Sequence, residues 1–405
     1  MTGEILFLAH RIPFPPDRGD KIRSWHVLKH LAGLARVHLA CFADHAADED
    51  QLDGLRHALG DRLGDVHVEV RRTPRFIAAA RAFATGKPLS LTLFDSPRMR
   101  SFVAERLADS RVSAVYAFSG QTAQFVPEKA RQRFVMDFVD MDSAKFEAYA
   151  DAGGLLAPIH SREARILSAF ERQVAARADA CLFVSEAEAG LFRTRSGASN
   201  VHALANGIDS GHFAPDAAFP RLAAAERGEG PLLLFTGQMD YRPNVDAVRW
   251  FAAEVLPRLP SARFVIAGRN PTAEVKSLAG ARITVAGEVR DMRSWLAAAD
   301  VVVAPLRIAR GIQNKVLEAM AMARPVVASP AAFEGIEAEQ ARDLVVANDA
   351  EAMAREIERL LASPDRAATL GAAARRRAVA DYGWDSRLAP LESLIFPGPA
   401  KQAAA

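Results

Sequence analysis

The chain has 405 residues, half of them hydrophobic, and its 51 Lys and Arg against 49 Asp and Glu leave a formal net charge of +2. This length suggests two to three ordinary domains with large cores. The near-balance of charge gives no argument for a nucleic-acid-binding protein. The two cysteines, Cys41 and Cys181, lie in apolar runs, so we expect reduced core residues and no disulfide or metal framework.

The N-terminus leads directly into an apolar strand, ILFLAH, without the charged region and cleavage site of a signal peptide. No apolar run approaches the length that spans a membrane. We therefore expect a cytoplasmic protein.

A loop rich in proline, HRIPFPPDRGDKIR, follows the first strand and precedes a helix from about Ile22 to Leu34. The prolines keep the loop extended. Gly19 would permit a sharp turn, and Asp20 is the expected N-cap. Such a loop is where a Rossmann-like half meets its ligand, although the glycines of a dinucleotide fingerprint are absent. The alternative is an ordinary surface loop.

Residues 37–42 and 66–70 predict two more strands, and the segment from Arg71 to Phe94 that follows contains no acidic residue. It carries five basic residues among four large apolar ones: Arg71, Arg72, Arg75, Arg81 and Lys87 among Phe76, Ile77, Phe83 and Leu89. A basic amphipathic segment of this kind suits an anionic membrane surface. The alternative is a solvated helix over the core.

Strands are also predicted at residues 112–118 and 133–138, and the second ends in DFVDMDS. Asp137, Asp140 and Asp142 cluster at its carboxyl end. Paired carboxylates there could orient an acceptor hydroxyl or accept its proton. Metal chelation is the weaker interpretation, because acids on an extended segment alternate in direction; a structural capping role is also open.

A long helix from Arg162, a strand at 180–184 and the NGID turn at 206–209 complete a first domain, residues 1–208. The composition then shifts to Pro and Gly, and we interpret residues 209–230 as a linker. A second α/β series, residues 231–382, opens with a strand at 232–236. In GQMDYRPNVDAVRWF, Gly237 lets the backbone approach a ligand, and a helix is predicted near Asn244.

Residues 299–329, ADVVVAPLRIARGIQNKVLEAMAMARPVVAS, predict a β-loop-α-β unit. Val301 to Ala304 form the apolar run of a strand that is covered on both faces. A helix is predicted from Ile312, and Arg324-Pro325 ends it. The helix begins at the carboxyl end of a parallel strand, where open α/β sheets bind ligands.

Backbone N–H groups at such a helix start bind anions without a metal; here they would belong to Gly311, Ile312 and Gln313. Arg310 and Lys315 add positive charge, and Glu318 lies three residues beyond Lys315, on the same side of the helix. These groups suit a diphosphate attached to a hydroxyl-bearing ring. The alternative is an ordinary βα unit in which Lys315 and Glu318 are simply solvated.

The segment NKVLEAMAMARPVVAS closely resembles the donor-site segment of glycosyltransferase family 4, the retaining GT-B enzymes. RGIQNKVLEAMAM, PPDRGDKIRS and GQMDYRPNVD are similar to a branch associated with exosortase/PEP-CTERM exopolysaccharide loci. Two features depart from the family pattern. The first of two glutamates eight positions apart falls at Arg310, and an arginine–lysine pair falls at Gln238 and Pro243.

The resemblance implies a GT-B fold, an α/β architecture of two Rossmann-like domains whose parallel sheets face each other across a cleft. Residues 383–396 would form a helix that crosses back to the first domain, and residues 397–405 are expected to be disordered.

In the family, the second glutamate, here Glu318, binds the donor ribose, backbone groups at Val289 hold the nucleobase, and the Gly19 loop lines the cleft. A histidine of many members has Asp140 as its nearest counterpart. The candidate donor-binding residues are Gly19, Gly237, Arg242, Asn244, Val289, Arg310, Gly311, Ile312, Gln313, Lys315 and Glu318, and the candidate catalytic residues are Asp140 and Lys315. No metal or cofactor is expected.

The expected function is transfer of a sugar from a nucleotide-diphosphate donor, with retention, in exopolysaccharide or glycolipid assembly. Two kinds of acceptor stay open, a lipid-linked one and a soluble one; with a lipid-linked acceptor, the protein would be peripheral on the inner membrane through residues 71–94. The alternatives are an inactive nucleotide-sugar-binding protein and a nucleotide-sugar epimerase. A dehydrogenase would need the glycine fingerprint that the chain lacks.

Overall fold

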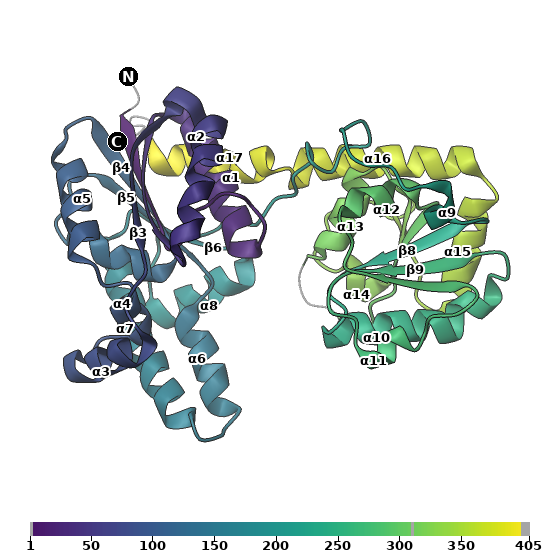
Figure 1. The fold of residues 1–405 in the computed structure, drawn as a ribbon, viewed down its shortest axis with the longest axis horizontal. Coiled ribbons are helices and arrows are strands. Elements are labelled where there is room, and N and C mark those ends of the chain that lie inside the picture. The colour runs from purple at the N-terminus through teal and green to yellow at the C-terminus, as the bar shows by residue number, and fades with distance from the viewer. Residues whose placement is uncertain (1–2, 309–311, 398–405) are drawn as a thin grey trace, which may run out of the picture. The chain divides into compact units, whose positions relative to one another are not determined.

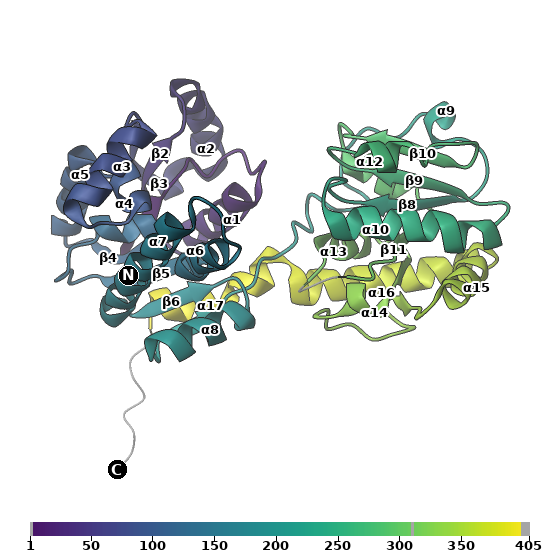
Figure 2. The same ribbon diagram turned by 90° about the horizontal axis from the view of Figure 1, so that it is seen from below.

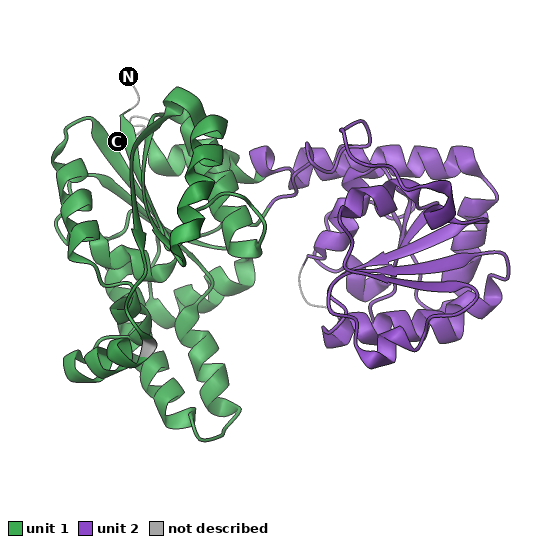
Figure 3. Cartoon of the chain, viewed as in Figure 1, with its two compact units in different colours: residues 1–206, 387–405 green, residues 207–386 purple. Residues whose placement is uncertain are grey.

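The computed structural model describes residues 3–308 and 312–397. These divide into two compact units (Figure 3). Unit 1 runs to Asn206 and takes up the chain again from Arg387, and unit 2 comprises Gly207–Ser386. Each unit is an open α/β structure with helices on both faces of a sheet (Figure 1).

The sheet of unit 1 has seven described strands in the order β3-β2-β1-β4-β5-β6-β7. All its neighbours are parallel. The strands are β1 Glu4–Ala9, β2 Val37–Ala43, β3 Leu63–Val70, β4 Val112–Phe118, β5 Arg133–Val139, β6 Ala180–Phe183 and β7 Val201–Ala203. The order reverses between β1 and β4, which places the ligand crevice of such a sheet at the carboxyl ends of these two strands. Every residue of β2 is buried, as continuous apolar runs of parallel strands require.

The α-helices of unit 1 lie in the connections between its strands, with three between β3 and β4 and two between β5 and β6. They are α1 Gly19–Leu34, α2 Gln51–Leu59, α3 Arg75–Thr85, α4 Leu89–Leu93, α5 Pro97–Ala108, α6 Asp142–Asp151, α7 Ala157–Arg177 and α8 Glu186–Ser196. The last helix, α17 Trp384–Ile395, lies mainly in unit 1, where Arg133 donates a hydrogen bond to the Leu394 carbonyl. Cys41 and Cys181 are buried free thiols, as predicted.

The sheet of unit 2 has six described strands in the order β10-β9-β8-β11-β12-β13, again parallel. They are β8 Leu232–Thr236, β9 Arg263–Ala267, β10 Ile283–Gly287, β11 Val301–Ala304, β12 Val326–Ala328 and β13 Val345–Val346. Its helices are α9 Ala224–Arg227, α10 Arg242–Trp250, α11 Ala273–Lys276, α12 Met292–Ala298, α13 Asn314–Ala321, α14 Pro330–Phe333, α15 Ala350–Leu361 and α16 Pro364–Tyr382. The order reverses between β8 and β11, so these two strands frame the ligand position of unit 2.

The segment that we interpreted as a linker, residues 209–230, packs on unit 2. Phe213, Phe219 and Leu222 rest against its core. Arg375 donates to the Phe213 carbonyl at 3.0 Å, and Ser294 to the Pro220 carbonyl at 2.6 Å. The proline- and glycine-rich segment 209–230 is therefore largely irregular in structure but packs on unit 2.

In the part of the chain that the structure describes, no helix is both long and apolar enough to cross a membrane.

Candidate functional site

Three neighbouring strands of unit 2 each have a glycine at the carboxyl end, and backbone hydrogen bonds of these glycines connect the strand ends. Gly237 follows β8, Gly268 follows β9, and Gly287 ends β10. The Gly237 N–H donates to the Ala267 carbonyl at 3.1 Å, and the Gly268 N–H to the Gly287 carbonyl at 2.7 Å. A Cβ on Gly268 would lie 1.6 Å from the Gly237 oxygen, so only glycine permits this close approach.

Lys315 is held at this edge by residues far from it in sequence. Its ammonium donates to the side-chain oxygen of Asn244 and lies 4.5 Å from the centroid of the Phe235 ring. The Asn244 amide in turn donates to the Gln238 carbonyl at 2.9 Å. Gly237 has a φ of 154°, and a Cβ there would meet Asn244 at 2.8 Å and the Lys315 ammonium at 3.2 Å. The structure therefore brings Gly237, Asn244 and Lys315 together around the end of β8.

Lys315 and Glu318 are both half-buried on α13. Burial lowers the pKa of Lys315 to about 8, against the opposing attraction of Glu318. Burial raises the pKa of Glu318 to about 7, against the attraction of Lys315. Because both values lie near neutrality, the charge of this pair changes within the ordinary pH range. A bound diphosphate would favour the protonated lysine.

The helix starts two residues later than predicted. α13 begins at Asn314 with Gln313 as its N-cap, so Ile312 and Gln313 precede the helix. The first-turn N–H groups belong to Asn314, Lys315 and Val316, and the last of these donates to the Gln313 carbonyl at 2.9 Å. Arg310 and Gly311 lie outside the described residues.

Other predicted donor-binding residues have less defined surroundings. Arg242 is exposed at the start of α10, which begins two residues before the predicted Asn244. Val289 is half-buried beyond β10 and packs against the unit 2 core. Gly19 is exposed at the start of α1, where a Cβ would meet nothing within 4 Å. No steric reason for glycine is therefore found at position 19, and the expectation of a sharp turn there is wrong.

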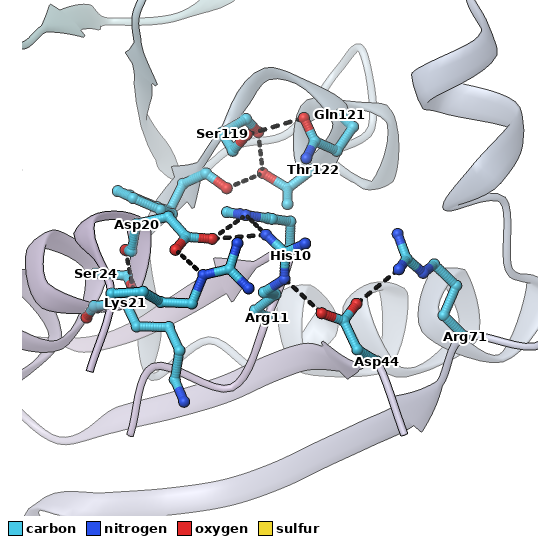
Figure 4. A network of polar contacts seen from close by, with 12 residues as sticks. His10, Arg11, Asp20, Lys21, Ser24, Asp44, Arg71, Ser119, Gln121 and Thr122 are labelled. Atoms are coloured by element: carbon cyan, nitrogen blue, oxygen red, sulfur yellow. Dashed lines mark hydrogen bonds and ion pairs between the residues drawn. The ribbon is translucent and has the colours of Figure 1, made fainter. Parts of the chain in front are cut away.

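The corresponding edge of unit 1 carries a closed network of ion pairs (Figure 4). Arg11, just after β1, donates to Asp20 at 2.6 Å and to Asp44 at 2.7 Å. Arg71 donates to Asp44 from the other side at 2.7 Å. The His10 ring lies 3.2 Å from the Asp20 carboxylate. Asp20 is thus a charge partner in the first turn of α1, and the N-cap that we predicted for it is occupied by Arg18.

These pairs hold the acids in their charged form. Burial opposes ionisation of Asp20, yet its hydrogen bonds with His10 and Arg11 keep its pKa well below the ordinary value. Partial burial opposes ionisation of Asp44 as well, but the hydrogen bond from Arg11 and the positive charges of Arg11, Arg71 and Arg18 together lower its pKa. Beside them lies a hollow of about 250 Å³ whose lining includes Arg11, Lys21 and Asp44.

Asp137, one of the three clustered acids, has a structural role. It is fully buried and accepts from Arg23 at 2.9 Å and from the Tyr116 hydroxyl at 2.6 Å. Arg23 also donates to the Leu204 carbonyl and to Asn206. One buried guanidinium therefore connects α1 with β5 and with the segment that ends at Asn206.

Asp140 remains accessible, with a side chain 35% exposed, and Lys145 donates to it at 2.8 Å. The preceding Val139 has a φ of 71°. This left-handed conformation is uncommon for a β-branched residue and tends to occur at functional sites. Glu171 fixes the next turn by accepting from Ser143 N–H at 3.0 Å and from its hydroxyl at 2.5 Å. The strained turn therefore presents Asp140 at the carboxyl edge of the sheet.

Sequence reasoning missed several partners. Lys145 lies three residues after Asp142, a spacing that could have pointed to it as the counterion of the acidic cluster. Nothing local pointed to Asp44 and Arg71 as members of the Arg11 network. In the described part of the chain, no group of three or more His, Cys, Asp or Glu side chains is placed to hold a metal ion.

Two Rossmann-like units, each with polar groups at the switch point of a parallel sheet, define the GT-B class of fold. Solved structures agree with this. HepE from Anabaena, in complex with UDP, is 16% identical, with a TM-score of 0.60 over 96% of this chain and 98% of that one. Sucrose-phosphate synthase from Thermosynechococcus elongatus is 19% identical, with a TM-score of 0.62 over 97% and 98%.

Two family models cover most of the sequence. Residues 11–207 match the glycosyl transferase 4-like domain, and residues 230–363 match the glycosyl transferases of group 1. The chain is therefore a member of the family 4 type of GT-B glycosyltransferases. It is similar to the GDP-mannose-dependent alpha-(1-6)-phosphatidylinositol monomannoside mannosyltransferase of Mycolicibacterium smegmatis, 29% identical over 55% of this chain. That match spans 64% of the relative's length.

Proposed function

We propose that this protein transfers a hexose from a nucleoside-diphosphate donor to an acceptor hydroxyl, with retention at the anomeric carbon. The observation that carries the proposal is the group formed by Gly237, Asn244, Lys315 and Glu318 at the switch point of unit 2. A close backbone, an ammonium and a carboxylate there suit a diphosphate attached to a ribose. Solved neighbours with bound UDP and UDP-glucose support the donor class.

In the proposed reaction the bond between the anomeric carbon and the diphosphate oxygen breaks, and the acceptor oxygen bonds to that carbon. The acceptor proton passes to the leaving diphosphate. Lys315 and the start of α13 stabilise the charge that develops on this group. Glu318 binds the ribose hydroxyls, and Asp140 orients the acceptor hydroxyl from unit 1. These steps require neither a metal nor a protein nucleophile.

The acceptor in this proposal is lipid-linked, and the pathway is exopolysaccharide or glycolipid assembly. The M. smegmatis relative, which by its name acts on a phosphatidylinositol mannoside, supports a lipid acceptor. Residues 71–94 support a peripheral position on the inner membrane, because α3 buries two of its alanines and exposes its two aromatic residues. Ala78 and Ala82 are buried, whereas Phe76 and Phe83 are 75% and 59% exposed.

The test is a screen of nucleotide sugars, beginning with GDP-mannose and UDP-glucose, for donor hydrolysis and for transfer to membrane lipid extracts. We expect one donor to be consumed and its sugar to appear on a lipid. Asp140→Asn should lower transfer by about tenfold or more, because a charge-assisted hydrogen bond to the acceptor hydroxyl is worth about 1.5–3 kcal/mol, while donor binding stays unchanged. Binding of a nucleoside diphosphate without sugar consumption would favour an inactive binding protein, and conversion of the donor into its epimer would favour an epimerase.

A further inference from the structure

Exposed large apolar side chains concentrate at one end of unit 1. They lie on two elements, α3 and the tip of the α6–α7 hairpin: Phe76, Phe83, Tyr149, Leu155, Leu156 and Ile159. Among the described residues only four other large apolar side chains reach comparable exposure, and these are scattered: Ile22, Tyr241, Ile308 and Val379. A clustered apolar surface, unlike scattered residues, indicates a contact with something apolar.

The hairpin tip is the most exposed part of this surface. Leu155 is fully exposed and Leu156 is 57% exposed, in a turn that begins with Gly153 and Gly154. Both glycines have positive φ, so the turn projects the two leucines beyond the ends of the helices. Neither leucine is buried in the folded unit. Packing of the core therefore does not explain why these two positions are apolar.

The second element is fastened beside the hairpin. Arg162, in the first part of α7, donates to the Ala82 carbonyl at 2.8 Å and lies 4.6 Å from the Phe83 ring centroid. Glu163 accepts from the Leu89 N–H at 2.8 Å. Both elements lie at the lower end of unit 1 in Figure 1 and face the viewer in Figure 2. Phe76 and Phe83 are seven residues apart and share one face of α3.

Charge selects the kind of partner. No acidic residue occurs from Arg71 to Phe94 or from Ala152 to Ser161. Arg72, Arg81 and Lys87 are exposed around α3. Arg71 is only partly exposed and is already paired with Asp44, so we do not count it among these cations. A second copy of this face would bring cations against cations. An anionic lipid surface satisfies the cations and the apolar side chains at the same time.

We propose that the α6–α7 hairpin tip and α3 form a two-pronged contact with an anionic membrane surface, with Leu155 and Leu156 inserted below the headgroups. This contact extends the proposed association through residues 71–94 to a separate element, and it rests on the proposed function only for its purpose. α3 follows β3, and α6 follows β5, so both prongs leave the carboxyl edge of the sheet that carries Asp140. A lipid-linked acceptor in the membrane would then lie near the edge of the sheet that carries Asp140.

The experiment measures co-sedimentation of the full chain with vesicles of phosphatidylcholine, with and without phosphatidylglycerol. We expect binding to the anionic vesicles, and a loss of about tenfold or more in affinity for the Leu155→Ser, Leu156→Ser double variant. Val379→Ser, an exposed apolar position in unit 2, is the matched control and should bind as the wild type. Leu155→Trp should shift its fluorescence emission to shorter wavelength when anionic vesicles are added.

Several outcomes would overturn the proposal: absence of vesicle binding by the wild type, unchanged binding by the double variant, or a dimer in light scattering that the same substitutions abolish. Hydrolysis of the donor sugar nucleotide, measured without vesicles, should be equal in wild type and double variant. Vesicle binding by a chain that consumes no donor would defeat the proposed function and leave the membrane contact standing.

Discussion

At the carboxyl edge of unit 1, Asp20 and Asp44 each accept hydrogen bonds from arginines, and their pKa values are lowered. At the same edge of unit 2, Lys315 and Glu318 are half-buried with pKa values that burial has moved towards neutrality, to about 8 and about 7. The first network satisfies its own charges. The second holds charges that burial disfavours, and a ligand bearing a diphosphate and hydroxyls would stabilise them. We infer that unit 1 provides a preformed scaffold and that unit 2 provides the binding charge.

The largest expected effect concerns the scaffold. Arg23→Met leaves Asp137 fully buried without its cation. Breaking a buried pair in this way should lower the free energy of unfolding of unit 1 by about 3–5 kcal/mol. Chemical denaturation measures the loss. The control is Arg195→Met, which breaks an exposed pair with Glu147 and should cost less than about 1 kcal/mol. Equal losses would mean that burial of the pair is unimportant.

The next effect concerns the binding charge. Lys315→Met should lower the rate of sugar transfer about tenfold or more, because a charge-assisted contact with the diphosphate is worth about 1.5–3 kcal/mol. Stability at pH 7 should stay equal or rise, because burial disfavours the ammonium in the free protein. Lys276→Met, on the surface of α11, should change neither quantity. An unchanged transfer rate in a folded Lys315→Met variant contradicts the assignment.

A pH series sharpens the same assignment. Lys315 is protonated below its pKa of about 8, and the bound diphosphate needs that proton. Affinity for a nucleoside diphosphate should therefore decline above about pH 8, by up to about tenfold per pH unit. Isothermal titration calorimetry from pH 7 to pH 10 measures the slope. The Lys315→Met variant should bind more weakly and with no such slope; a parallel decline in both proteins would assign the titration to another group.

The smallest effects are opposite pH dependences of stability in the two units. The pKa of Glu318 is about 7 in the folded state against an ordinary 4.5. Wild-type stability therefore falls as pH rises through that window, and Glu318→Gln should remove the fall.

The pKa of Asp44, in unit 1, is lowered from 3.8. Its contribution is fully present above that value and declines as pH falls through the lowered folded pKa, so Asp44→Asn should destabilise more at pH 7 than at pH 3. Denaturation at both pH values distinguishes the two signs; the same sign for both variants would contradict the comparison.

The amino-acid sequence by itself determined the local elements and their class. Apolar runs such as Val301 to Ala304 indicate buried parallel strands, and the spacing of Lys315 and Glu318 places them on one side of a helix. These features depend on neighbours within a few residues, which is the range over which periodicity carries information. Helix starts were less certain, as the two-residue shifts at α10 and α13 demonstrate, because terminal turns depend on contacts outside the helix.

Only the tertiary structure decided the partners. Lys315 meets Asn244 across 71 positions, and Arg23 meets Asp137 across 114. The strand order β8-β11 and β1-β4 creates these meetings, and no local pattern encodes strand order. The same holds for the leucines at the hairpin tip. Their sequence reads as an ordinary apolar turn, and their exposure follows from where α6 and α7 end, since burial is a property of the packed chain.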